Sequence, residues 1–324
     1  MRLVLLLSCA LLASCASTEV PWGGRLPEHW IDGTEEAEPE FQVHEYAQGT
    51  WILRQSLLTN FEGPFLYLFV GDERALLLDS GAGGVDVVGA VDQLLGADGP
   101  PLLVAHTHGH GDHTAGDAEL ARRPNTVVIG SSAEEVHAFF RFEGRGRDLA
   151  TLDLGDRVLD VFPIPGHDPA HIAVYDRKTG VLVTGDSLYP GRLYVPVDKW
   201  EAYVRSMNRV AEWCETHPVA AVLGTHIEMT DEPGVDYEFG ATVHANERGL
   251  LLTPAHVREL AATLEEMSAA DALERTVRDD FIVFPLGPWR GESEEDEGEE
   301  EVVEEEVAEE EPAPAAQEEA GEAP

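Results

Sequence analysis

Eight consecutive residues, His106 to His113, contain four histidines and one aspartate. Imidazole and carboxylate groups together suit Zn²⁺, Fe and Mn²⁺ as ligands. The run directly follows a short apolar stretch typical of a buried strand, and glycines between the histidines let the chain bend around an ion. Side chains two residues apart on an extended chain point the same way, so His108 and His110 can hold one ion. Asp112 and His113 can turn towards a second, and the run therefore predicts a site for two divalent metals.

This run can be read in two registers, because His106 also stands two residues before a histidine. Only the register that begins at His108 places an aspartate and a histidine four and five residues later. We therefore take the motif as His108-x-His110-x-Asp112-His113 and treat His106 as a neighbour. At the end of an apolar strand, this motif resembles the first metal motif of the metallo-β-lactamase superfamily.

Four further segments resemble the same superfamily, in the same order along the chain. They are 76–81, which ends in Asp-Ser-Gly, then 165–171, 182–186 and 223–226. The last three carry His167, Asp186 and His226 respectively. A single short motif often matches by chance, whereas five matches in order seldom do. The resemblance extends over roughly residues 40 to 285.

The resemblance implies an α+β fold, the four-layer αββα sandwich, with metals at the edge of the sheets. It also implies the metal ligands, with Asp186 bridging the two ions. One ion would be held by His108, His110 and His167, and the other by Asp112, His113 and His226. We expect two divalent ions, with Zn²⁺ favoured and Fe or Mn²⁺ as alternatives. Water between two such ions has a pKa of about 7, so a bridging hydroxide would be the nucleophile, with Asp112 accepting or steering its proton.

Single residues narrow the reaction expected within this superfamily. The β-lactamases carry Cys or Ser where this chain has Asp186, which disfavours β-lactamase activity. Flavodiiron relatives carry Glu at the position of His110, and the nucleic-acid-processing members have a large extra domain for which this chain has no room. Hydrolysis of an ester, lactone or thioester is the favoured activity. A phosphodiester or phosphonate hydrolase and a non-catalytic metal-binding lipoprotein are the alternatives, and the intact ligand set favours an enzyme.

Residues outside the ligand set are also candidates for a role in the site. Tyr189 stands three residues after the bridging aspartate, where acyl homoserine lactonases have a tyrosine that donates to the substrate carbonyl oxygen; the alternative is an aromatic residue packed under the site. Asp79 either orients a ligand histidine or serves as a turn residue. Arg141, Arg145 and Arg147 either meet an anionic group of the substrate or are surface charges.

The chain is strongly acidic, with a formal net charge of −41 over 324 residues. Residues 291–324 contain 17 acidic and no basic side chains, which leaves 45 acidic and 21 basic ones elsewhere. This tail cannot bury a core and is predicted to be disordered. Because nucleic-acid binding requires a basic surface, we exclude nucleic acid as a partner and expect a small-molecule substrate. The oligomeric state stays open.

The N-terminus predicts export. Residues 1–15 hold one arginine and a short apolar core, as in a secretory signal, and are too short to span a membrane. The end of this segment, Leu-Ala-Ser-Cys15, resembles the bacterial lipoprotein cleavage box. We therefore expect Cys15 to carry a lipid that anchors the protein on the extracytoplasmic side of the cell envelope. The alternative is an ordinary secretory signal that is cut nearby. Cys214 then remains as the one unmodified cysteine, which excludes an intrachain disulfide.

The apolar patterns divide the remaining chain into a linker over 16–40 and a hydrolase domain over 41–290. Hairpins are predicted where two apolar runs flank a short polar turn, and helices where apolar residues recur at helical spacing. The expected hairpins are 65–70 with 74–79 and 171–175 with 181–184; the expected helices are 85–95, 131–140, 198–214 and 254–267. Further strands are expected at 101–105, 126–129, 158–162, 219–223 and 281–284. Strands with helices between them suit two sheets packed face to face with helices outside.

Overall fold

The computed structural model describes residues 24–96, 99–144, 148–270 and 272–287. Several predictions fall elsewhere: the signal segment 1–15 with its Cys15, part of the linker, Arg145, Arg147 and the acidic tail 291–324 lie outside the described residues. No helix within the described ranges is both long and apolar enough to cross a lipid bilayer.

The first sheet has six strands in sequence order. They are β1 (Phe41–Ala47), β2 (Thr50–Gln55), β3 (Phe65–Val70), β4 (Ala75–Leu78), β5 (Leu102–Ala105) and β6 (Thr126–Val128). The first four strands are antiparallel hairpins, and β4, β5 and β6 run parallel. Helix α1 (Val87–Leu95) connects β4 to β5, and the short helices α2 (Gly111–Thr114) and α3 (Asp117–Leu120) lie between β5 and β6. The histidine motif therefore follows an inner strand of this sheet.

The second sheet also has six strands, in the order β13-β12-β10-β9-β8-β7. They are β7 (Ala150–Asp153), β8 (Val158–Pro163), β9 (Ile172–Asp176), β10 (Val181–Gly185), β12 (Ala221–Gly224) and β13 (Leu251–Leu252). A separate three-stranded sheet joins β11 (Arg192–Pro196), β15 (Ile282–Leu286) and β14 (Thr276–Val277). The remaining helices are α4 (Ala133–Phe140), the 3-10 helix η1 (Val197–Lys199), α5 (Trp200–Thr216) and α6 (Pro254–Ser268).

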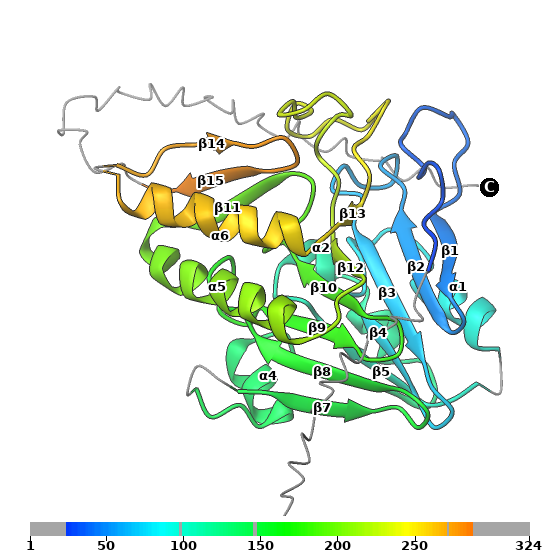
Figure 1. Cartoon of the computed structure of the whole chain (residues 1–324). Coiled ribbons are helices and arrows are strands. Elements are labelled where there is room, and N and C mark those ends of the chain that lie inside the picture. Colours follow the sequence, from blue (N-terminus) through cyan, green and yellow to red (C-terminus); the bar gives the residue numbers. More distant parts are fainter. Residues whose placement is uncertain (1–23, 97–98, 145–147, 271, 288–324) are drawn as a thin grey trace, which may run out of the picture. The chain divides into compact units, whose positions relative to one another are not determined.

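Alternation of side chains along the strands produces the four layers. In β3, Tyr67 faces the core between the two sheets, whereas the preceding Leu66 faces α1 on the outer side. In β9, Val174 faces the same central core and Tyr175 packs with α5 and α6. Figure 1 shows these two helices side by side against the second sheet. The predicted αββα sandwich is therefore confirmed.

Three local features differ from the expectations. The hairpin of β1 and β2 was not predicted, although Gly49 at its turn adopts a φ of +69° that favours glycine. The strand expected at 281–284 forms, but it pairs with β11 in the third sheet and does not close a main sheet. The described part of the expected linker packs on the domain, where Trp30 is buried with its ring centroid 5.0 Å from that of Phe65. A buried tryptophan outweighs the polar composition of that segment.

Candidate metal centre

The seven predicted ligands come together in two groups at one edge of the sandwich. One group consists of His108, His110 and His167; the other consists of Asp112, His113, Asp186 and His226, and within each group the donor atoms lie within 4.8 Å of one another. The loop after β5 and helix α2 supply the ligands from the first sheet, and the residues that follow β8, β10 and β12 supply the others. Each group thus draws on both sheets.

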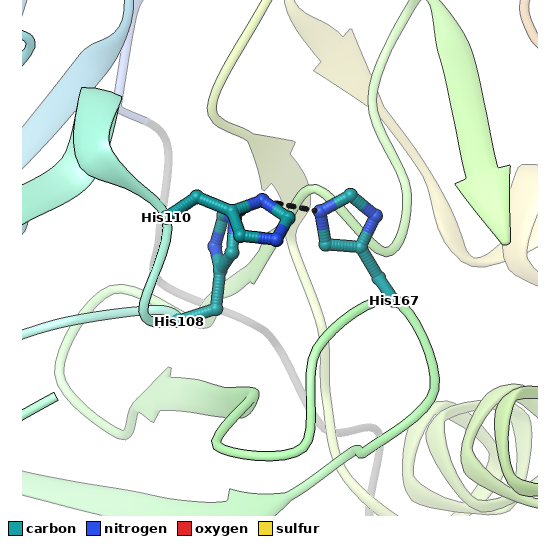
Figure 2. A group of neighbouring side chains, drawn as sticks. All are labelled: His108, His110 and His167. Atoms are coloured by element: carbon teal, nitrogen blue, oxygen red, sulfur yellow. Dashed lines mark hydrogen bonds between the residues drawn. The ribbon is translucent and has the colours of Figure 1, made fainter. Parts of the chain in front are cut away.

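The first group contains only histidines (Figure 2). Nε2 of His108 lies 3.0 Å from Nδ1 of His110, and Nε2 of His167 lies 3.2 Å from the same atom. His110 is exposed, whereas the other two rings are buried. Ligand atoms about 2.0–2.1 Å from a tetrahedral Zn²⁺ stand about 3.3 Å apart, so these three nitrogens fit one ion.

The second group mixes histidines with carboxylates. Oδ2 of Asp112 lies 3.0 Å from Nε2 of His113 and 3.3 Å from Nε2 of His226. Oδ1 of Asp186 lies 3.4 Å from Nε2 of His226, while its Oδ2 lies 3.7 Å from Nε2 of both His108 and His167. Asp186 therefore contacts both groups, as a bridging ligand must.

The outer nitrogens of three ligand histidines are held by hydrogen bonds. Nδ1 of His167 donates to the carbonyl oxygen of Tyr194, and Nδ1 of His226 donates to that of Glu62, both at 2.8 Å. Nδ1 of His113 lies 3.1 Å from the carboxylate of Asp79. These contacts fix each ring and direct Nε2 inward, the arrangement that metal-binding histidines use.

Asp79 is wholly buried and contacts Thr107 as well as His113. Its carboxylate also accepts a hydrogen bond of 2.7 Å from the backbone N–H of Thr107, and a further one from the Thr107 hydroxyl. The residue itself adopts a φ of +69°. Of the two roles considered for Asp79, the structure supports the orientation of a ligand, since Asp79 links the strand end at Thr107 to His113.

Two glycines let the chain approach the site closely. Gly185 precedes Asp186 with a φ of +53°, and a Cβ there would lie 2.5 Å from Nε2 of His171. Gly166 precedes His167, and a Cβ there would lie 2.4 Å from the Cα of Tyr203. Any side chain at either position would displace the following ligand.

The two groups differ in their electrostatics. Burial would raise the pKa of Asp186, but the charges of His226 and His113 outweigh it and hold this pKa well below the ordinary value. Burial would likewise lower the pKa of His226, yet Asp186 and the hydrogen bond to Asp112 raise it to about 10. In the first group, burial lowers the pKa of His108, and the nearby His113 lowers it further. The second group therefore concentrates negative charge, where a cation can replace protons.

Other predicted residues lie outside the two groups. The hydroxyl of Tyr189 donates to the carbonyl of Arg192 at 2.6 Å and lies 3.0 Å from Glu228, while its ring packs 5.5 Å from that of His226. The hydroxyl hydrogen of Tyr189 is thus engaged within the protein, and donation by Tyr189 to a substrate stays a prediction. Arg141 is exposed at the C-terminal end of α4.

The register of the histidine motif is the one expected. His106 is buried away from the ligand groups, and its Nε2 lies 2.8 Å from the carboxylate of Asp117. Cys214 is partly buried, and burial raises the pKa of its thiol to about 11, in keeping with a packing role.

Comparison with known proteins places this geometry in a family. The sequence model described as the metallo-β-lactamase superfamily matches residues 60–212. A hydroxyacylglutathione hydrolase of Xanthomonas euvesicatoria is 34% identical over 147 residues, which are 44% of this chain and 54% of that protein. An acyl-coenzyme A thioesterase of Gallus gallus is 30% identical over 200 residues, which are 51% of this chain and 72% of that protein.

A solved structure supports the fold. A metallo-β-lactamase from Pontibacter korlensis matches with a TM-score of 0.50 at 16% identity, covering 69% of this chain and 99% of that one. The chain spans about half the length of the first curated relatives that it matches. Taken with the two ligand groups, these matches show that the chain belongs to the metallo-β-lactamase superfamily.

Proposed function

We propose that the protein is a dinuclear metal-dependent hydrolase that cleaves an ester, a lactone or a thioester. The observation that carries this proposal is the pair of ligand groups with Asp186 in contact with both. The matched relatives named as a hydroxyacylglutathione hydrolase and an acyl-coenzyme A thioesterase support the reaction class. Aspartate at position 186 argues against β-lactam turnover.

The metal ions and Asp112 have different roles in the proposed reaction. When bound, two divalent ions supply a water of lowered pKa and an electrophile for the scissile carbonyl. Asp112 is half-buried, and burial alone would raise the pKa of its carboxyl. The charges and hydrogen bonds of His113 and His226 outweigh burial and hold this pKa well below its usual value, so the carboxylate stays ionised. In this proposal the ionised carboxylate of Asp112 accepts or steers the proton of the attacking water.

Elemental analysis of the purified full-length protein, with a panel of chromogenic substrates, tests the proposal. The panel contains an ester, a lactone, a thioester, a phosphodiester and a β-lactam. We expect two metal ions per chain and chelator-sensitive turnover of one of the first three substrates. Less than one metal per chain under metal-replete conditions contradicts the dinuclear site, and turnover of the phosphodiester alone would establish the alternative activity.

We also propose that the protein is lipid-anchored through Cys15 at the cell envelope. The Leu-Ala-Ser-Cys15 sequence supports this location. Metabolic labelling with a fatty acid, followed by membrane fractionation, is the test. We expect label in the membrane fraction for the natural sequence and loss of label for Cys15→Ser. An unlabelled natural protein in the soluble fraction would overturn the anchor.

A further inference from the structure

Glu62 and Tyr194 border the metal centre on two sides. The carbonyl of Glu62 holds His226 of the second group, and that of Tyr194 holds His167 of the first, each at 2.8 Å. The side chains of Glu62 and Tyr194 nevertheless interact electrostatically with each other. Glu62 therefore stands beside the second group and Tyr194 beside the first, and we call this partly buried border of the centre its rim.

The carboxylate of Glu62 has no partner among the residues that the structure describes. Within the described part of the chain it makes no hydrogen bond or ion pair, although its backbone N–H is bound to Asn60. Burial raises the pKa of the Glu62 carboxyl, the nearby His226 lowers it, and three other carboxylates, those of Asp112, Glu228 and Asp186, raise it further.

Those other carboxylates are compensated by their own partners. Asp112 and Asp186 belong to the ligand set. Glu228 forms an ion pair of 2.8 Å with Arg192, and the same arginine also pairs with Asp236 at 3.1 Å. Arg192 is thus already engaged by two carboxylates. Among the described residues, no arginine or lysine therefore forms an ion pair with the Glu62 carboxylate at the rim.

An apolar contact lies next to Glu62 in the chain. Phe61 directly precedes Glu62, and its ring meets that of Phe239 edge to face at a centroid distance of 5.4 Å. Both rings are exposed to solvent. A rim with a carboxylate that makes no ion pair with the described residues, next to exposed aromatic rings, favours uncharged or cationic groups over anionic ones.

We propose that Glu62 is a specificity-determining residue that selects uncharged and cationic esters or thioesters over anionic ones. The proposal rests on the hydrolase function proposed above and names the substrate class of the same site. Thioesters of glutathione and coenzyme A carry carboxylates or phosphates on their thiol portion. We therefore expect this chain to disfavour the substrates that appear in the names of its matched relatives.

Three acetyl thioesters that differ in the charge of the thiol portion test the proposal. They are the esters of thiocholine, 2-mercaptoethanol and 3-mercaptopropanoate, which are cationic, neutral and anionic, and the released thiol is measured in each case. For the zinc-loaded full-length protein we expect kcat/KM for the anionic ester to be at least about tenfold below that for the cationic one. Added salt should narrow this difference, because it screens exposed charges.

The variant Glu62→Gln removes the charge and keeps the size of the side chain. We expect it to change the ratio of kcat/KM for the anionic and cationic esters by about tenfold in favour of the anion, mainly through KM. The matched control is Glu259→Gln, which removes the same charge from an exposed position on α6 and should leave the ratio unchanged.

A second readout separates the two proposals. Calorimetric titration of the zinc-loaded protein with the S-methyl thioethers of the three thiols, which have no thiol group to bind zinc as a thiolate, measures the same charge preference without turnover. If no ester is cleaved, the proposed hydrolase function loses its support from thioesters, yet a preference for the cationic thioether that Glu62→Gln abolishes still supports the role of Glu62. If turnover occurs but Glu62→Gln leaves both the kinetic and the binding ratios unchanged, the role of Glu62 is overturned.

Discussion

The two ligand groups of the metal centre are opposites in charge and exposure. The first contains three histidines and no carboxylate, and its His110 is open to solvent. The second contains two carboxylates, and all its members except Asp112 are buried. One half therefore offers neutral nitrogen donors, and the other holds negative charge that protons or cations must balance. The difference implies that the two metal positions are unequal in affinity, in pH dependence and in their part in the reaction.

The largest effect is expected from removing the carboxylate that belongs to the second group alone. Asp112→Ala should lower turnover by about 100-fold or more, because the base is lost. It should also reduce the metal content from two ions towards one, since the histidine group stays intact. Elemental analysis and steady-state kinetics on the same preparation measure both quantities. A variant that keeps two metals and full turnover would remove the functional distinction between the groups.

The pH dependence of metal binding should differ between the two groups. In the metal-free protein, Asp186 and Asp112 raise the pKa of His226 to about 10, so a metal must displace a proton throughout the neutral range. The metal affinity of the second group should therefore fall by up to about tenfold for each pH unit below 10 if binding releases one proton. In the first group, burial lowers the pKa of His108 and that of His167, so binding above pH 7 needs no proton release from either ring.

Competition with a chromophoric zinc chelator at pH 7, 8 and 9 measures this difference. We expect one affinity that rises steeply with pH and one that stays nearly constant. Two affinities with the same slope would show that the protons are shared across the whole centre.

A smaller effect is expected from the residue that orients His113. Asp79→Asn keeps the shape of the side chain, and asparagine tolerates the φ of +69° at this position. The loss of charge beside His113 should weaken the second metal by about 10- to 100-fold and leave the first nearly unchanged. The same chelator competition tests this, and equal weakening of both metals would contradict it.

The smallest effect is expected at Tyr189. If its hydroxyl serves only the Arg192 carbonyl and Glu228, Tyr189→Phe should lower the free energy of unfolding by about 1 kcal/mol and alter turnover by less than about fivefold. A donor to the substrate oxygen would instead reduce kcat by about 100-fold. Chemical denaturation and kinetics on the same variant decide between these roles.

The members of the two groups were predictable from the sequence because their signals are local. The histidine motif, the glycine before Asp186 and the apolar runs before them all lie within a few residues of the groups that they position. The same locality made the central strands predictable. The pairing of 281–284 with β11 was missed because it depends on which distant edge is available, and periodicity does not report this.

The residues that orient the ligand histidines were only partly predictable from the sequence. Asp79 was a candidate because its carboxylate is a recognisable partner for a histidine. Glu62 and Tyr194 hold His226 and His167 through backbone carbonyls, which every residue type possesses. Residue identity therefore carries no signal for such contacts, and only the topology that brings the loop after β2 to the end of β12 reveals them.

The placement of the ligands on both sheets has a mechanical consequence. His108, His110, Asp112 and His113 follow a strand of the first sheet, while His167, Asp186 and His226 follow strands of the second. A pair of bound ions would link the two sheets of the sandwich to each other, as a disulfide links two segments of a chain. A chelator would thus remove this link and lower the stability of the edge where the sheets meet, while the hydrophobic core between the sheets stays in place.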